Sequence, residues 1–397
     1  MAFSEFLESR RARAKALVAA LKEQFEYVSM LGVDTRSKHI MVNANSSGIL
    51  NGDDTECGFV VKINNGGCFF EYSMDDIGAD IPAAAAQVKE SFTVSKLLRE
   101  GSIDRIVLKD EPLVQSFARP TDLASYSDKD ALSFVQKMQK ELQAKSEHIL
   151  NAMIRVSTLE VSKLFVSANR ELDQNYTWIN GFMGLAYREN DKTVQVFGFC
   201  DSANMADVMA ELPGKMDDLV DRAHHLTLAK PIEPGVYDVI TAPSITGLIA
   251  HEAFGHGVEM DQFVKDRALA KQYVGKYVAS PICNMRDGAA AALSVASYFF
   301  DDDGVLAGNT QIIKDGILVT GISDLASAAQ LGTAPTGNGR RQSSRRKAYS
   351  RMTNTFFEKG KDKLEDMIAS IQHGYMLFET SNGMEDPKNW AIQCVAQ

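Results

Sequence analysis

Residues 244–261 read Ser244-Ile-Thr-Gly-Leu-Ile-Ala-His-Glu-Ala-Phe-Gly-His-Gly-Val-Glu-Met-Asp261. This stretch carries two histidines, His251 and His256, on one short segment whose apolar residues predict a helix. Two imidazoles so placed can bind a divalent metal ion, and the carboxylate of Glu252 beside the first can take a proton from water. The stretch therefore predicts His251 and His256 as metal ligands and Glu252 as the catalytic base of a metal-dependent peptidase.

The spacing of the two histidines makes a prediction about the helix itself. Residues five apart on a regular α-helix diverge by roughly 140°, so His251 and His256 would point away from each other. Gly255 and Gly257 flank the second histidine, and glycine lowers the cost of leaving α geometry, as at a π-bulge. We therefore expect the helix to be irregular or to end between His251 and Gly257. The alternative is that two histidines and a glutamate fall together by chance on a buried helix.

Three further motifs lie downstream of this stretch. They are Asp301-Asp302-Asp303-Gly304, Pro335-Thr336-Gly337-Asn338-Gly339-Arg340-Arg341 and Arg351-Met352-Thr353-Asn354-Thr355. Together with the histidine segment they resemble, in the same order, the landmarks of the TldD/PmbA family of peptidases. The resemblance is strong over residues 236–389 and weak but compatible before them. TldD-like members keep the metal-binding helix and PmbA-like (TldE) members have lost it, so this chain resembles the metal-keeping kind.

The resemblance implies zinc as the cofactor and hydrolysis of unfolded or extended peptides, bound largely through main-chain contacts. It also implies a dimer, either of identical chains or with a PmbA-like (TldE) subunit. In the family the third ligand is a cysteine in a Gly-x-Cys-Gly context, several dozen residues beyond the segment that resembles 382–394. Because the sequence ends at Gln397, we expect this chain to lack that C-terminal piece and to hold little zinc as given. Cys394 is interpreted as an ordinary strand residue.

Composition and charge are those of a globular protein with a large core. The chain has 397 residues, a net charge of −10 and a hydrophobic share of 45%. The acidic surface disfavours nucleic-acid binding, and no apolar run approaches the ~20 residues of a membrane span. Five cysteines without a C-x-x-C pair argue against a disulfide framework. We expect a cytoplasmic protein with no membrane partner.

Two domains are predicted. Pro231-Ile-Glu-Pro-Gly235 cannot continue a helix, so it divides residues 1–230 from residues 231–397. We expect an α+β fold, with helices packed on antiparallel sheet in the first domain. The second domain is expected to be largely antiparallel sheet carrying the metal-binding helix, and incomplete at its C-terminus.

Periodicity and turn residues predict the individual elements. Helices are expected over residues 3–30, 76–100, 127–150 and 204–229, and strands over 39–43, 57–63, 67–72, 154–169, 182–187, 193–200, 236–242 and 293–300. Asn64-Asn65-Gly66-Gly67 predicts one hairpin turn and Lys314-Asp315-Gly316 another. Residues 101–120 are expected to be extended.

Three other polar clusters allow more than one interpretation. Asp301–Asp303 is interpreted as a turn that faces the active cleft, because an EF-hand would need a later acidic residue and flanking helices. The arginines and lysine of residues 338–347 could bind substrate carboxylates or balance nearby acids, and we favour the second. The adjacent His224 and His225 cannot both face one metal on a helix and are expected to be solvated or capping.

The alternative to a peptidase is a non-catalytic partner or scaffold subunit of a TldD/PmbA-type complex that has kept the motif. The sequence assigns no substrate-binding residues. It also leaves open the natural peptide, exo- or endo-cleavage, and whether the dimer is homo- or heteromeric.

Overall fold

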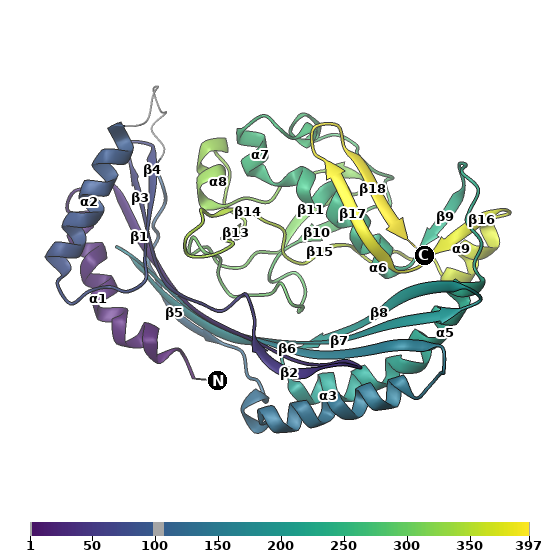
Figure 1. The fold of residues 1–397 in the computed structure, drawn as a ribbon. Coiled ribbons are helices and arrows are strands. Elements are labelled where there is room, and N and C mark those ends of the chain that lie inside the picture. Colours follow the sequence, from purple (N-terminus) through teal and green to yellow (C-terminus); the bar gives the residue numbers. More distant parts are fainter. Residues whose placement is uncertain (1, 98–106, 397) are drawn as a thin grey trace.

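The computed structural model describes residues 2–97 and 107–396. Its first part is one eight-stranded sheet, with core order β4-β3-β1-β6-β7-β5, in which β2 also pairs with β1 and β8 with β7. The strands are β1 Tyr27–Val42, β2 Ser47–Asn51, β3 Glu56–Asn65, β4 Cys68–Met74, β5 Leu113–Ala118, β6 Ile149–Ser167, β7 Arg170–Glu189 and β8 Lys192–Ser202. All pairs are antiparallel except β5 with β7. The sheet curves strongly along its long central strands (Figure 1).

Helices cover the convex face of this sheet (Figure 1). They are α1 Glu5–Lys22, α2 Ile81–Leu97, α3 Asp128–Gln143, α4 Met205–Glu211 and α5 Met216–Leu228, with short 3-10 turns η1 Leu123–Ser125 and η2 Leu212–Lys215. Helix α3 begins at a capping box of Ser127 and Asp130 and buries Ala131, Val135, Met138 and Leu142 at three- and four-residue steps. Alternate residues of β6, among them Ile154 and Val156, meet that stripe.

The hollow of the sheet holds the C-terminal part of the chain (Figure 1). Its strands are β9 Asp238–Thr241, β10 Met285–Asp287, β11 Thr310–Lys314, β12 Ile317–Leu318, β13 Gly339–Arg340, β14 Tyr349–Ser350, β15 Thr355–Phe357, β16 Gly374–Leu377, β17 Thr380–Asp386 and β18 Ala391–Ala396. Its helical elements are α6 Pro243–Ile249, η3 Ala250–Gly255, η4 His256–Val258, α7 Met260–Val264, η5 Leu269–Tyr273, α8 Leu325–Leu331 and α9 Leu364–Ser370. A four-stranded sheet, β12-β11-β10-β15, and three two-stranded sheets hold these elements together.

Buried ion pairs join the sheet to the C-terminal part. Lys62 on β3 pairs with Asp303, and Lys163 on β6 pairs with Asp302. Arg341 pairs with Glu71 on β4, with Nη1 2.6 Å from Oε2. Burial alone would raise the pKa of Glu71, but Lys62 and Arg341 hold it below its usual value. Charges buried this deeply are tolerated because each has a partner.

The fold class and both hairpins are confirmed. Helices and antiparallel sheets make an α+β protein. Gly66 and Gly67 turn β3 into β4 with positive φ, and Asp315 and Gly316 do the same between β11 and β12. The domain boundary at residues 230 and 231 stays a prediction.

Several expected elements are wrong in extent. The helix predicted over 3–30 ends at Lys22 because β1 begins at Tyr27, and the one predicted over 127–150 ends at Gln143 because β6 begins at Ile149. Pro213 interrupts the helix expected over 204–229, giving α4, η2 and α5. The helix expected over 76–100 is α2, and its last residues, with residues 101–106, lie outside the described part.

The strand expected over 293–300 is also wrong. Side chains of β7 form hydrogen bonds with backbone groups of this segment that would otherwise pair with a neighbouring strand. Gln174 donates to the Phe300 carbonyl at 2.8 Å and accepts from the Phe299 amide at 2.8 Å. The indole of Trp178 donates to the Ser297 carbonyl at 3.3 Å. The segment is therefore held against the sheet without joining it.

None of the helices within residues 2–97 and 107–396 has the length and apolar character to cross a membrane. The cytoplasmic location stays a prediction.

Candidate metal centre

The histidine segment is the end of a helix that starts normally. Ala242 caps α6 and Pro243 occupies its first turn, where a missing amide proton does no harm. Ile245 is buried and anchors the helix to the protein. Beyond Ile249 the helix changes type, because Ala250–Gly255 form a π-helix and His256–Val258 a 3-10 turn. The predicted irregularity between His251 and Gly257 is confirmed.

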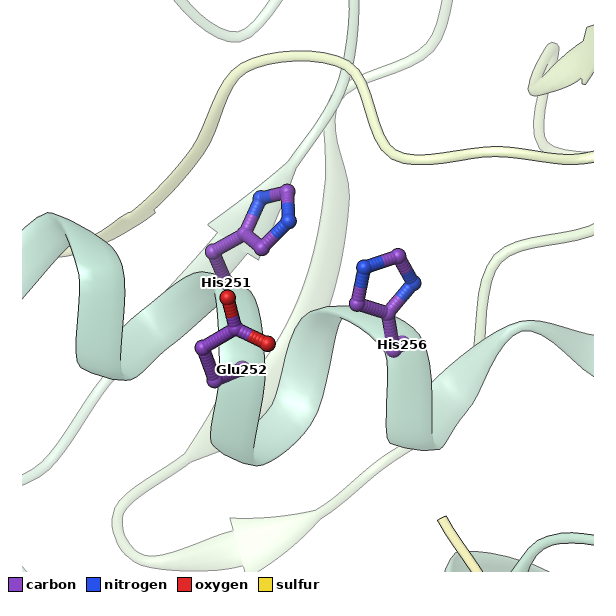
Figure 2. Close-up of side chains that lie close together, drawn as sticks. All are labelled: His251, Glu252 and His256. Carbon is purple, nitrogen blue, oxygen red and sulfur yellow. The ribbon is translucent and has the colours of Figure 1, made fainter. Parts of the chain in front are cut away.

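The π segment brings the two histidines to one side. The hydrogen bonds of a π-helix join residues five apart, so His251 and His256 lie on the same face of the helix. In a regular α-helix they would lie on different faces. One ligand atom each from His251, Glu252 and His256 lie within 4.8 Å of one another. The two imidazole rings are 4.7 Å apart and nearly perpendicular. Figure 2 shows both rings and the Glu252 carboxylate on the same side of the ribbon.

Burial and charge differ among the three side chains. Glu252 is buried, His256 is half-buried and His251 reaches solvent. Partial burial and the nearby His256 ring lower the pKa of His251, which favours the neutral imidazole that ligates metals. The carboxylate of Glu259 raises the pKa of His256.

Glu259 and Arg351 support the second histidine. Glu259 is 4% exposed, and its Oε1 lies 3.4 Å from Nδ1 of His256. Its Oε2 pairs with Nη1 of Arg351 at 3.0 Å. A carboxylate on one ring nitrogen fixes the orientation of a ligating histidine and raises its basicity. Nε2 of His256 is therefore the atom left to face a metal.

Two close approaches shape the surroundings. A Cβ at Gly255 would lie 1.9 Å from the sulfur of Met352, so any other residue there would force the Met352 side chain to move. A Cβ at Gly383 on β17 would lie 2.4 Å from Oε1 of Glu252. Strand β17 therefore passes directly over the carboxylate of Glu252.

The β17–β18 ribbon brings two more side chains near the site. Cys394 on β18 is the register partner of Gly383, and burial and the Glu252 charge raise the pKa of its thiol. Cys394 lies on a strand as predicted and is not part of the three-residue cluster found among the described residues. Glu385 lies two residues beyond Gly383 on β17.

The other polar clusters lie elsewhere. Asp301–Asp303 do not face the histidine cluster. All three are buried, and Asp302 and Asp303 pair with lysines of the large sheet. Asp301 and Asp302 line a cavity that includes none of His251, Glu252 and His256. In the basic cluster Arg341 and Arg345 pair with Glu71 and Asp75, which agrees with the charge-balancing interpretation.

The two adjacent histidines do not form a metal pair. His224 contacts Glu189, with Nδ1 2.6 Å from Oε2. A protein carboxylate thus occupies one of its ring nitrogens.

Comparison with known proteins relates the C-terminal part of the chain to a family of metallopeptidases. Residues 234–397 match the family model of the PmbA/TldA metallopeptidase C-terminal domain. The C-terminal part of the chain is therefore similar to that domain of the TldD/PmbA family. The histidine cluster and the β17–β18 ribbon both lie inside the matched residues.

Two curated relatives are metalloproteases. A metalloprotease of Synechocystis sp. is 27% identical over 310 residues, which are 75% of this chain and 65% of that protein. A zinc metalloprotease TldD homolog of Saccharolobus solfataricus is 34% identical over 164 residues, 41% of this chain and 36% of that protein. The chain thus matches less than two thirds of the length of either relative. These names support a metal-dependent peptidase family, with zinc named in one case.

Two solved structures share the fold. A candidate modulator of DNA gyrase from Bacteroides thetaiotaomicron has a TM-score of 0.76 at 14% identity, covering 98% of this chain and 90% of that one. TldE from Thermococcus kodakarensis has a TM-score of 0.72 at 18% identity, covering 94% of this chain and 84% of that one. At these identities the likeness concerns the fold alone.

Sequence reasoning did not assign Glu259, Gly383 or Glu385 to the site. Glu259 stands three residues after His256, a helical spacing that could have indicated a partner for its ring. Gly383 and Glu385 lie more than a hundred residues away, and only the path of β17 brings them to the helix.

Proposed function

We propose that this chain is a zinc-dependent peptidase that hydrolyses unfolded or extended peptides. The observation that carries the proposal is the π segment, which gathers ligand atoms of His251, Glu252 and His256 within 4.8 Å. The two imidazoles fit the nitrogen preference of zinc, and the carboxylate of Glu252 lies beside them. When bound, zinc would polarise a substrate carbonyl and make water more acidic.

Each residue of the centre has its own role in this proposal. His251 and His256 would hold the ion, and Glu259 would keep the His256 ring in orientation through the 3.4 Å contact at Nδ1. Glu252 would act as general base, because its carboxylate lies beside both rings. The similarity to TldD/PmbA proteins makes a dimer with an identical or TldE-type chain part of this proposal.

The test is Glu252→Gln in the natural protein that contains this chain. The change keeps the side-chain shape and removes the base, so kcat should fall by ~10² or more. Zinc content, measured by mass spectrometry, should stay at the wild-type value because both histidines remain. Cleavage of an unstructured peptide at the wild-type rate would remove Glu252 from this role, and a wild-type protein that holds zinc but cleaves nothing would favour the scaffold alternative.

A further inference from the structure

A cavity of about 360 Å³ lies between the large sheet and the C-terminal part of the chain. One wall consists of residues on β1, β6 and β7, and the other of residues 295–298, 300–302 and 340–344. No residue of the histidine cluster lines it. Binding sites for small molecules commonly measure roughly 300–1,000 Å³ and often lie between packed units of a protein. The cavity is therefore a candidate for a second binding site.

The sheet wall of the cavity is apolar and aromatic. Leu159 and Val161 on β6 face Trp178 and Tyr176 on β7, their register partners. Residues two apart on a strand point to the same side, so these four side chains form one surface. Trp178 and Tyr176 are only 6% and 7% exposed, which fixes their rings in place. This wall suits a ligand with a flat apolar body.

Two arginines line the cavity with donors that the protein leaves over. The side chain of Arg341 is 3% exposed, and its Nη1 and Nη2 donate to Glu71 at 2.6 and 2.9 Å. Its Nε is buried and has no hydrogen-bond partner among the described residues. Arg340 donates from Nη1 to the Met352 carbonyl at 2.8 Å, and no carboxylate of residues 2–97 and 107–396 lies within ion-pair distance of it. An unpaired buried donor is unfavourable, so an acceptor in the cavity would be stabilised.

The buried acids of the cavity are already engaged. Asp301 accepts three backbone amides, and Asp302 pairs with Lys163 and accepts the Arg341 amide at 2.8 Å. Burial alone would lower the pKa of Lys163, but Asp302 holds it above its usual value, so the ammonium group stays charged. An ammonium group has three N–H donors, and one hydrogen bond to Asp302 leaves the others for a ligand. The interior therefore offers donors and takes an acceptor.

Three further acids limit the charge of that acceptor. Oε2 of Glu56 accepts the Ser344 amide at 3.1 Å, and Asp53 and Asp54 line the cavity as exposed residues. Negative charges at the mouth oppose the entry of a ligand with two or more negative charges. A group with one negative charge and two oxygen acceptors, a carboxylate, fits both the donors inside and the acids at the mouth.

We propose that this cavity binds a small molecule that joins an aromatic or apolar body to a single carboxylate. The carboxylate accepts hydrogen bonds from Arg340, from Nε of Arg341 and from Lys163. The body packs on the rings of Trp178 and Tyr176. This site is separate from the metal centre and independent of the proposed peptidase function.

Calorimetric titration of the natural protein that contains this chain tests the site. The probes are 3-phenylpropionate, its neutral counterpart 3-phenylpropan-1-ol, and the doubly charged 2-phenylethyl phosphate. The carboxylate should bind about tenfold more tightly than the alcohol or better, as expected for hydrogen bonds from charged donors. The phosphate should bind more weakly than the carboxylate because of the acids at the mouth.

Two variants separate a specific contact from a general effect of charge. Arg340→Gln removes an exposed cation that has no acid partner among the described residues, and should weaken the carboxylate about tenfold while leaving the alcohol unchanged. Arg346→Gln makes the same change at an exposed arginine that does not line the cavity, and should bind all three probes as wild type does. Melting temperatures of both variants should match wild type.

Removal of zinc by a chelator should leave the affinity for 3-phenylpropionate unchanged, because the metal centre does not line the cavity. Loss of binding on chelation would place the probe at the metal and overturn the inference. So would equal binding of the carboxylate and the alcohol, no binding of the carboxylate, or an unchanged carboxylate affinity in Arg340→Gln.

Discussion

At the scale of single residues, the centre depends on atoms that the metal would not touch. Oε1 of Glu259 lies 3.4 Å from Nδ1 of His256, and Oε2 of Glu259 pairs with Arg351. This arrangement is the carboxylate–histidine support seen at many metal sites, where it sets ring orientation and basicity. The histidine pair alone would be a weaker site.

Glu259→Gln should therefore lower zinc affinity by about 10–100-fold, the usual effect of losing such a support. The amide keeps the volume but gives up the charge that both His256 and Arg351 contact. Competition with a zinc chelator gives the affinity directly. Glu233→Gln, an exposed change outside the centre, serves as the control. Unchanged affinity in Glu259→Gln would mean that the contact does not support the ligand.

At the scale of elements, residue types predicted the distortion and offered a π-bulge as one form of it, without deciding between that and the end of the helix. A five-residue histidine spacing with flanking glycines required a break in the helix, and the structure supplies it as a π-helix followed by a 3-10 turn. Local turn chemistry likewise predicted the hairpins. The strand predicted over 293–300 is wrong because side chains of β7, which is remote in sequence, form hydrogen bonds with the backbone of this segment. The path of β17 over Glu252 could not be predicted from the sequence either, since it is set by tertiary packing.

Strand β17 gives an element-scale prediction. In Gly383→Ala the new methyl group would lie 2.4 Å from Oε1 of Glu252, so the carboxylate or the strand must move. Misplacement of a catalytic group by about 1 Å can lower the rate by ~10². Steady-state kinetics should show this fall in kcat with zinc content unchanged, because neither histidine is displaced. Gly360→Ala, which meets no atom within 4 Å, should behave as wild type. A fully active Gly383→Ala would show that β17 does not confine the base.

At the scale of the whole molecule, buried charges hold the C-terminal part in the hollow of the sheet. The Lys62 and Asp303 side chains are 8% and 0% exposed. Asp301 in the same turn accepts amide hydrogen bonds from Asp303, Val305 and Gly339, which fixes the turn against the sheet. The three aspartates therefore serve packing, although the sequence alone suggested a turn in the cleft.

Removing one partner of this pair should be strongly destabilising. Lys62→Met leaves the Asp303 carboxylate buried without its lysine and should lower the free energy of unfolding by about 3–5 kcal/mol. Lys38→Met removes the exposed pair with Asp128, whose Nζ–Oδ1 distance is 2.7 Å, and should change it by about 1 kcal/mol or less. Urea unfolding measures both. Equal, small effects would contradict the role of the buried pair.

The central claim is that His251 and His256 hold a metal ion, and zinc content tests it most directly. The natural protein that contains this chain should be purified with close to one zinc per chain, and His251→Ala and His256→Ala should each lose it. His225 lies on α5, outside the centre, so the control variant His225→Ala should keep its zinc. Zinc retained at the wild-type level in both His251→Ala and His256→Ala would contradict the account.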